Sequence, residues 1–319
     1  MIEVKHLVKK YGSHLAVDGL DFKLEPGRIY GFLGPNGAGK STTMNIMTGY
    51  LGATEGEVLI DGHDILKEPE KAKKHIGYLP EIPPLYTDMT VMEYLEFAAE
   101  LKALPKENRQ SDIEEVMSLT KLMEVQHRLI RNLSKGYCQR VGLAQAILGF
   151  PDIIILDEPT VGLDPKQIIE IRELIRNLSE KHTVILSSHI LAEVREVCDY
   201  ILIISKGKLV ASDTPDNLER LRNGMESLEI ETRADFDVVQ GVLEPIAGIE
   251  SVQIEQSEAG TTCVRIETEA GSDIREAVFL AFSEKKIPLL MMKTAEVSLE
   301  EVFIELTQGK GDVTNEGDL

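Results

Sequence analysis

Apolar and polar positions follow three patterns along the chain, and each pattern predicts a different kind of structure. Up to residue 60, short apolar segments such as EVKHLVKKY and HLAVDGLDFKL are separated by turn residues, which predicts strands. From residue 85 to 150 the apolar side chains recur at helical spacing, as in TVMEYLEFAAELK. The pairs Thr90–Glu93 and Ser111–Glu114 match the capping box, so a helix is expected to begin at each of them.

The third pattern begins after Pro151 and consists of continuous apolar runs. The segments DIIILDEP, HTVILSSH and YILIISKG alternate with helical stretches such as KQIIEIRELIRNLSEK. Strands without polar alternation are buried on both faces, and such strands form parallel sheets that are covered by helices. The sequence therefore predicts an α/β domain over residues 1–222.

A second domain is expected over residues 225–308. The chain turns polar from Arg220 to Glu226, and the segments that follow predict the element order βαββαβ. This order is typical of a ferredoxin-like α+β sheet with helices on one face. Its last helix, SLEEVFIELTQ, is expected to be capped by Ser298 and Glu301. Residues 309–319 are expected to form a disordered tail.

Composition excludes several classes of protein. A chain of 319 residues has room for two domains, but no apolar run approaches the roughly 18 residues of a membrane span, and the start lacks the pattern of a secretory signal. Cys138, Cys198 and Cys263 show no zinc or disulfide spacing, so we expect buried cysteines in a reducing cytosol.

Negative charge is concentrated in the second domain. The net charge is −20, and from residue 221 onward 8 Lys or Arg stand against 21 Asp or Glu, a balance of −13. An acidic domain repels phosphate backbones and anionic lipid, because like charges repel. We therefore expect neither nucleic acid nor direct lipid insertion.

The segment GPNGAGKS, residues 34–41, matches the phosphate-binding pattern G-x-x-x-x-G-K-[ST] at every fixed position. It follows the expected strand RIYGFLG and begins an expected helix, KSTTMNIMTG. Its glycines allow backbone N–H groups to point at an anion without Cβ clashes. Lys40 supplies a cation for the β- and γ-phosphates, and the Ser41 hydroxyl can ligate Mg²⁺.

Two carboxylates follow the apolar run IIIL and are candidates for the chemistry. Neighbouring side chains on a strand point to opposite sides, so Asp157 and Glu158 are expected to have different roles. We assign Asp157 to the metal and Glu158 to the attacking water, because an ordinary glutamate is ionised at neutral pH and can accept a proton. His189 follows the next buried strand and is expected to reach the γ-phosphate, because open sheets bind ligands at the carboxyl ends of their strands.

Seven segments, in this order, resemble the motifs of the ATP-binding subunit of ABC transporters. They are KKYG with the adenine-stacking Tyr11, the Walker A loop GPNGAGKST, the Q-loop IGYLPE, the signature NLSKGYCQR, the Walker B segment IIILDEP, the D-loop VGLD and the switch histidine in SSHIL. Glu81 stands where the Q-loop usually has glutamine, and Lys135 and Tyr137 alter the usual LSGGQ signature. These variants and the acidic C-terminal domain resemble the ABC-2 export branch, which includes drug-resistance and gliding-motility subunits.

The resemblance implies a P-loop ATPase domain with a mixed sheet core, an antiparallel β subdomain and an α-helical subdomain. It also implies ATP and Mg²⁺ as ligands, with Lys40, Glu158 and His189 as catalytic residues and Ser41, Glu81 and Asp157 as metal ligands. Two subunits, expected to be identical, would face head to tail and hold each nucleotide between the Walker A loop of one and the signature of the other. The implied nucleotide contacts are Tyr11, Gly34, Pro35, Asn36, Gly37, Ala38, Gly39, Lys40, Ser41, Thr42, Ser134, Lys135, Gly136 and Asp164.

The implied partner is an integral membrane permease, which would place the chain in the cytoplasm at the inner face of the cell membrane. The helical region 85–150 and the segment PEIPPLYTD are the expected docking face. Two alternatives remain open. A non-transport ATPase of the same superfamily would carry long coiled-coil insertions or a second cassette, and a regulatory protein would use the βαββαβ domain to sense a ligand. The sequence does not indicate the transported compound.

Overall fold

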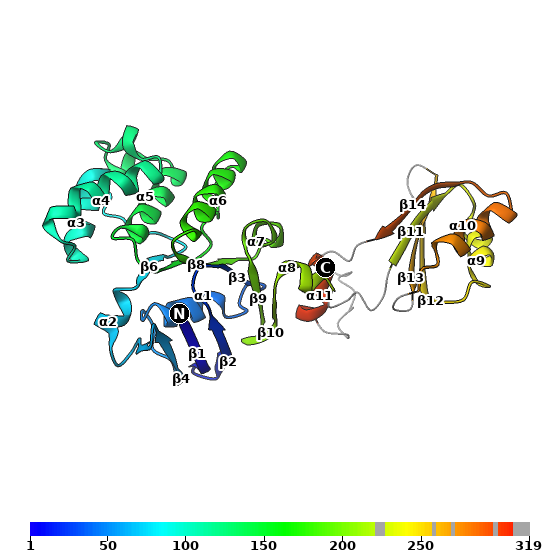
Figure 1. Cartoon of the computed structure of the whole chain (residues 1–319), viewed down its shortest axis with the longest axis horizontal. Helices are drawn as coiled ribbons and strands as arrows, with labels where there is room; N and C mark the ends of the chain where they lie inside the picture. Colours follow the sequence, from blue (N-terminus) through cyan, green and yellow to red (C-terminus); the bar gives the residue numbers. More distant parts are fainter. Residues whose placement is uncertain (221–226, 257–259, 269–271, 296–298, 309–319) are drawn as a thin grey trace. The chain divides into compact units, whose positions relative to one another are not determined.

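Two compact units make up the chain in the computed structural model, each with its own hydrophobic core (Figure 1). The structure describes residues 1–220, 227–256, 260–268, 272–295 and 299–308. Among the described residues, the first unit comprises Met1–Pro215 and the end of the last helix from Leu306 to Gln308, and the second lies within Asp216–Glu305. The expected boundary at residues 222–225, the expected cap Ser298 and the tail 309–319 lie outside the described residues.

A six-stranded sheet of order β10-β9-β3-β8-β7-β6 forms the centre of the first unit. Its neighbours are parallel except for β10, which pairs antiparallel with β9, so the sheet is mixed as expected. The central strands are buried along their whole length, which confirms the interpretation of their continuous apolar runs. The strands are β3 (Ile29–Leu33), β6 (Ile76–Leu79), β7 (Ile153–Leu156), β8 (Thr183–Ser188), β9 (Tyr200–Ser205) and β10 (Lys208–Asp213).

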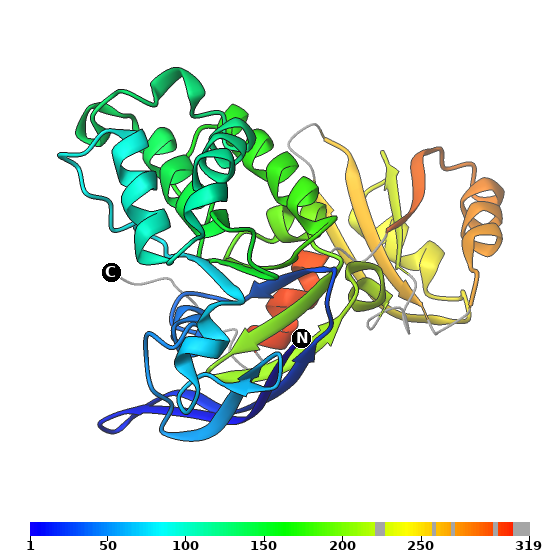
Figure 2. The same ribbon diagram turned by 60° about the vertical axis from the view of Figure 1, so that its left-hand side comes forward.

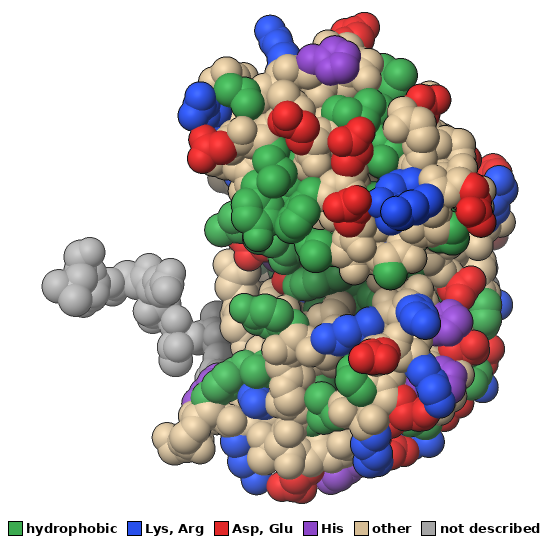
Figure 3. All heavy atoms as spheres, turned by 90° about the vertical axis from the view of Figure 1, so that its left-hand side faces the viewer, with side chains coloured by type: hydrophobic (Ala, Val, Ile, Leu, Met, Phe, Trp, Pro, Cys, Tyr) green, Lys and Arg blue, Asp and Glu red, His purple; other side chains and the backbone are tan. Residues whose placement is uncertain are grey.

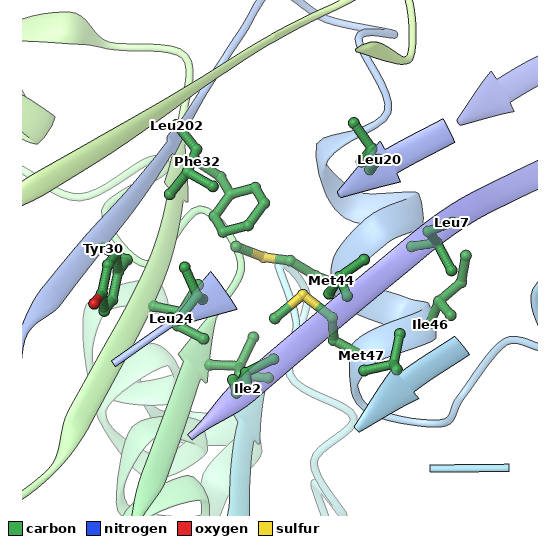
Figure 4. Close-up of a cluster of buried hydrophobic side chains, with 14 of the residues drawn as sticks. Ile2, Leu7, Leu20, Leu24, Tyr30, Phe32, Met44, Ile46, Met47 and Leu202 are labelled. Atoms are coloured by element: carbon green, nitrogen blue, oxygen red, sulfur yellow. The ribbon is translucent and has the colours of Figure 1, made fainter. Parts of the chain in front are cut away.

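An antiparallel sheet of order β2-β1-β4-β5 forms a second layer of this unit. Its strands are β1 (Ile2–Tyr11), β2 (His14–Leu24), β4 (Glu55–Ile60) and β5 (His63–Asp64). Helix α1 (Lys40–Met47) packs in the same core, where Figure 4 shows its Met44 and Met47 among side chains of both sheets. Because α1 is fixed by buried side chains, the loop that precedes it has a fixed position above the sheet.

The remaining helices of the first unit flank the six-stranded sheet or form a separate helical part. They are α2 (Pro69–Lys73), α3 (Val91–Leu101), α4 (Lys106–Leu119), α5 (Lys135–Ile147), α6 (Pro165–Ser179) and α7 (Leu191–Val197), with 3₁₀ turns at Met123–Val125 and Ile130–Asn132. The capping box of Thr90 and Glu93 is confirmed, because each side chain bonds the other's backbone N–H. The helix start expected at Ser111 is wrong. That residue lies inside α4, and its hydroxyl donates to the carbonyl of Asn108 instead of accepting from Glu114.

The second unit contains a four-stranded antiparallel sheet of order β12-β13-β11-β14. With its two helices this is the split βαβ order expected from the sequence, and Figures 1 and 2 show both helices on the same face of the sheet. The elements are β11 (Ser227–Thr232), α9 (Phe236–Leu243), β12 (Ile249–Gln256), β13 (Thr262–Thr268), α10 (Arg275–Glu284) and β14 (Leu289–Ala295).

Short helices lie on either side of this sheet in the sequence, α8 (Pro215–Arg220) before it and α11 (Leu299–Gln308) after it. The end of α11 belongs to the first unit, where the Ser205 hydroxyl donates to the Thr307 carbonyl at 3.4 Å. All three cysteines are free. The expectation that they are buried is confirmed for Cys198, whereas Cys138 is half-buried and the expectation is wrong for the exposed Cys263. Alternation on β13 turns this residue to the face of the sheet opposite the helices. None of the described helices is long and apolar enough to cross a membrane.

Candidate functional site

A cavity of about 350 Å³ gathers residues from loops far apart in the sequence. Most of the expected nucleotide contacts line it, together with two expected catalytic residues that follow other strands. The lining residues are Tyr11, His14, Ala16, Asn36, Gly37, Ala38, Gly39, Lys40, Ser41, Thr42, Glu81, Glu158, Val161 and His189. The cavity lies beyond the carboxyl ends of β3, β7 and β8, the position at which open α/β sheets bind ligands.

The loop between β3 and α1 has the conformation that an anion-binding loop needs. Gly37 and Gly39 have φ of 78° and 105°, a region that residues with a Cβ rarely adopt. Gly34 is needed for a different reason, because a Cβ there would lie 2.3 Å from the Ile204 carbonyl oxygen. The loop is therefore held in a curve with its backbone N–H groups available to a phosphate.

Lys40 is the buried cation of this loop. Its Nζ donates to the carbonyl oxygens of Gly34 at 2.7 Å and Pro35 at 3.2 Å. Burial lowers the pKa of Lys40, while the carboxylates of Glu158, Asp157 and Glu81 act in the opposite direction. A phosphate group would give this ammonium the anionic partner that the carbonyls do not supply.

Asp157 is buried beneath the cavity and is bound by two serine hydroxyls. Its Oδ1 accepts from Ser41 Oγ at 3.2 Å and from Ser187 Oγ at 2.5 Å. A carboxylate beside a hydroxyl suits Mg²⁺, which binds proteins through one or two such oxygens and takes its other ligands from water and phosphate. Within the described residues no group of three or more His, Cys, Asp and Glu side chains could hold a metal by itself. The donor set therefore fits a magnesium ion that arrives with a nucleotide.

Glu158 and His189 meet at the edge of the cavity. His189 Nδ1 lies 3.0 and 3.1 Å from the two carboxylate oxygens of Glu158. The expectation that strand alternation separates Asp157 from Glu158 is wrong, because β7 ends at Leu156 and alternation does not extend to either acid. The separation arises instead from the backbone of Glu158, which turns into the left-handed region with φ of 49°.

Sequence reasoning missed Ser187 and His14. Ser187 is fully buried, and it accepts the Glu158 backbone N–H at 2.9 Å while it donates to Asp157. The sequence signal for Ser187 was the pair of serines that ends the strand directly after its apolar run VIL. His14 pairs with Tyr11 across the β1–β2 hairpin, so both side chains stand on one face and line the cavity. Tyr11 is half exposed and carries the Lys9 ammonium 5.2 Å from its ring centre.

Six expected nucleotide contacts are not among the residues that line this cavity. Gly34 and Pro35 belong to the phosphate loop itself, where their carbonyls accept from Lys40, whereas Ser134, Lys135, Gly136 and Asp164 lie in other segments. The side chains of Ser134 and Asp164 accept backbone N–H groups in the first turns of α5 and α6, and so cap these helices. Gly136 lies against Gln167, since a Cβ there would come within 2.5 Å of that side chain. The Lys135 ammonium lies over Gly162 in the same way, so the signature segment packs on the D-loop of its own chain.

A second cavity of about 740 Å³ adjoins the first on the side of the helical part and shares Ser41 and Glu81 with it. Tyr50 and Ile82 line this groove and are each 82% exposed, which is unusual for large apolar side chains outside an interface. Figure 3 shows this end of the molecule, where hydrophobic side chains gather beside a hollow.

Comparisons with known proteins agree with this geometry. Residues 17–161 match the family model described as ABC transporter. The chain is 34% identical to the bacitracin transport ATP-binding protein of Bacillus licheniformis, over 97% of this chain and 98% of that protein. It is 30% identical to the linearmycin resistance ATP-binding protein of Bacillus subtilis, over 96% of this chain and 98% of that protein.

A solved structure also resembles the first unit. It is a dimeric ATP-binding cassette in a post-hydrolysis state bound to ADP and Pi. The match has a TM-score of 0.62 with 28% identity, and it covers 67% of this chain and 98% of that one.

Proposed function

The chain belongs to the ATP-binding subunits of ABC transporters, and we propose that it hydrolyses ATP at the cavity around Lys40 to drive export through a separate membrane permease. The observation that carries the proposal is the contact between Glu158 and His189 beside the phosphate loop, because these residues follow different strands and are 31 positions apart in the sequence. Such convergence of an acid, a histidine and a lysine on an anion-binding loop fits phosphoryl transfer to water.

The proposed chemistry assigns each group a separate task. The loop N–H groups and the start of α1 bind the phosphates, and Lys40 leaves the carbonyls of Gly34 and Pro35 to contact the β- and γ-phosphates. Glu158 orients a water molecule for attack and accepts its proton, while His189 contacts the γ-phosphate. Mg²⁺, held by Ser41 and Asp157 with Glu81 nearby, would neutralise charge on the phosphate oxygens. Tyr11 stacks on the adenine.

The proposed active form is a head-to-tail homodimer. Ser134, Lys135, Gly136 and Asp164 are not part of the lining of their own chain's cavity, which supports a role toward the nucleotide of a second copy. Lys135 would have to leave Gly162 to reach that nucleotide. The dimeric state of the similar cassette with ADP and Pi supports a dimer of this chain.

The proposed permease contact is the groove of the second cavity with the exposed Tyr50 and Ile82. Glu81 lines both this groove and the nucleotide cavity, so it can couple nucleotide binding to a change at the permease contact. The subunit would thereby lie on the inner face of the cell membrane. The names of two relatives matched over nearly the full length, bacitracin transport and linearmycin resistance, support export of a compound to which the transporter gives resistance.

The substitution Glu158→Gln tests this assignment. It keeps the hydrogen-bonding shape of the side chain but removes its ability to accept a proton, so hydrolysis should fall by about a hundred-fold or more while ATP binding persists. Phosphate release and fluorescent-nucleotide binding measure the two effects. With ATP, the variant should also elute as a dimer on gel filtration. A Glu158→Gln chain that turns over at the wild-type rate would contradict the assigned role.

A further inference from the structure

One buried carboxylate joins the two loops that carry Glu158 and His189. Glu193, on α7, is 6% exposed, and its Oε2 accepts a hydrogen bond from Thr160 Oγ1 at 2.6 Å and another from Ser188 Oγ at 3.2 Å. Thr160 lies two residues after Glu158, and Ser188 directly precedes His189. A single oxygen atom therefore connects the segments on both sides of the Glu158–His189 contact.

The bond to Ser188 also determines the shape of the turn that presents the histidine. Ser188 Oγ accepts the backbone N–H of Ile190 at 3.0 Å, so it closes a turn with His189 in the middle. A hydroxyl has one proton, and donation of that proton to Glu193 leaves a lone pair directed at the Ile190 N–H. Without the carboxylate the hydroxyl proton is left with its more distant acceptor, the Ile190 carbonyl at 3.5 Å, and the turn loses its link to α7.

The charge of Glu193 is compensated from helix α6. An Arg172 guanidinium nitrogen lies 3.8 Å from Glu193 Oε1, and the same arginine forms a closer ion pair with Glu196. Glu193 thus has two hydroxyl donors and a cation around a carboxylate that is almost excluded from water. Hydrogen bonds to a buried charged group are stronger than those between neutral groups, so this arrangement holds its neighbours firmly.

We propose that Glu193 is a positioning residue for ATP hydrolysis, which keeps the Glu158 loop and the His189 turn at the separation where the two side chains meet. Glu193 is not among the residues that line the nucleotide cavity, and its carboxylate reaches the two loops through Thr160 and Ser188. This inference rests on the proposed ATPase function and adds to it the residue that maintains the catalytic geometry. Since Thr160 precedes the D-loop, the same contact ties α7 to the segment that follows Walker B.

The test compares Glu193→Gln with Glu196→Gln in the full-length protein. Both residues lie on α7 and contact Arg172, but Glu196 is half exposed, and the bond recorded for its carboxylate is to that arginine alone. Glu193→Gln should lower kcat about ten-fold, as the weakening of one charged hydrogen bond predicts, with little change in the KM for ATP. Glu196→Gln should leave both constants close to wild type. Thermal unfolding of both variants measures any general loss of stability.

A second pair of variants separates positioning from folding. Thr160→Val keeps the shape of the side chain and removes one donor to Glu193, so it should also lower kcat with little change in KM. The double variant Thr160→Val, Glu193→Gln should be no slower than the slower single variant, because both changes break the same contact. If Glu193→Gln does not fold, Thr160→Val and Ser188→Ala carry the test, and a wild-type kcat in both would overturn the proposal.

Other results would also overturn it. If the fold reductions in kcat of the two single variants multiply in the double variant, Thr160 and Glu193 act separately. A fall in kcat that Glu196→Gln reproduces would reduce Glu193 to a general structural residue. A fluorescent ATP analogue without Mg²⁺ should bind all variants equally, and weaker binding to Glu193→Gln would place its effect at the phosphate loop. If the wild-type protein does not hydrolyse ATP, the proposed function fails, and that outcome is distinct from these.

Discussion

Glu158 has a backbone conformation that a residue with a side chain rarely adopts. Its φ of 49° lies in the left-handed region, where a non-glycine residue is strained by about 1–3 kcal/mol. The conformation persists because Ser187 accepts the Glu158 N–H and the Glu158 carbonyl accepts the Val161 N–H at 3.2 Å. The strained turn directs the Glu158 side chain to the cavity while Asp157 stays beneath it.

The substitution Ser187→Ala tests this account of the turn. It leaves the buried Glu158 N–H without its acceptor and removes a donor from Asp157 Oδ1, so unfolding free energy should fall by about 1–3 kcal/mol. Asp157 loses orientation, so the Mg²⁺ concentration for half-maximal ATPase activity should rise several-fold. Urea unfolding and a Mg²⁺ titration of activity measure the two effects.

Ser179→Ala is the matched control, because its hydroxyl donates to the Arg176 carbonyl of the same exposed helix segment. It should change neither quantity. An unchanged Mg²⁺ requirement in Ser187→Ala would mean that Ser41 alone orients Asp157.

At the scale of elements, the backbone carbonyls at the end of helix α5 accept hydrogen bonds from a lysine that follows helix α3. Lys102, the residue after α3, donates to the carbonyls of Gln145, Ala146 and Leu148 at 2.7, 3.1 and 2.8 Å. These carbonyls have no partners inside the helix, because the last turn of any helix leaves its C=O groups free. Burial lowers the pKa of Lys102 to about 8. Lys102 therefore fixes the end of α5, the helix that begins in the signature segment. Burial of its ammonium costs free energy, which opposes part of the stabilisation that these hydrogen bonds provide.

This arrangement predicts a pH dependence of stability. Lys102 is protonated in both states below pH 8; between about 8 and its ordinary value of 10.5 the folded protein binds fewer protons than the unfolded chain. Unfolding then takes up protons, so stability rises with pH over this window. The unfolding free energy of the wild type relative to Lys102→Met should increase by about 1–3 kcal/mol from pH 7.5 to 10. A difference between the two proteins that stays constant or declines over this range would refute the assignment.

Of the two helix starts expected from capping boxes in residues 85–150, the structure has the one at Thr90 and lacks the one at Ser111. A capping side chain needs backbone N–H groups that are not already bonded within a helix. Thr90 precedes the first turn of α3, and its hydroxyl accepts the Glu93 N–H at 3.3 Å. Ser111 has the same spacing to Glu114, but α4 already begins at Lys106, so the nearby N–H groups bond within the helix. A short sequence pattern does not tell whether the preceding turn is already helical.

At the scale of the whole molecule, the space around one glycine in each unit allows the stability of each unit to be tested separately. A Cβ at Gly77 of β6 would lie 2.1 Å from the Ala146 carbonyl oxygen, because this strand and α5 pack backbone to backbone. A Cβ at Gly241 of α9 would meet no atom within 4 Å. The first position therefore has no room for a side chain, and the second has no need to be glycine.

The pair predicts opposite effects in the two units. Gly77→Ala should destabilise the first unit by about 1–3 kcal/mol through overpacking, and Gly241→Ala should stabilise the second by about 0.5–1 kcal/mol, because alanine favours a helix. Hydrogen exchange, measured separately over residues 1–215 and 228–295, should show faster exchange in the first region for Gly77→Ala. It should show slower exchange in the second for Gly241→Ala. Wild-type exchange in Gly77→Ala would contradict the close packing.

The path of the chain through the units could not be deduced from the sequence. The βαββαβ order was predicted from periodicity, and the structure shows the corresponding sheet. However, the end of α11 from Leu306 to Gln308 belongs to the first unit, so the second unit is inserted in the sequence between two segments of the first. Periodicity identifies a helix such as α11 and its apolar face but does not say which core that face belongs to.

The sequence by itself determined the elements and the chemistry of the phosphate loop. Local rules decide both, since apolar spacing selects strand or helix and the glycines of residues 34–39 permit the loop. Only the tertiary structure decided which side chains hold Glu158 and His189, the proposed catalytic pair, in place. Ser187, Thr160 and Glu193 bond partners up to 33 residues away, and nothing in the local sequence fixes such distances. They depend on how β7, β8 and α7 pack, which is a property of the whole first unit.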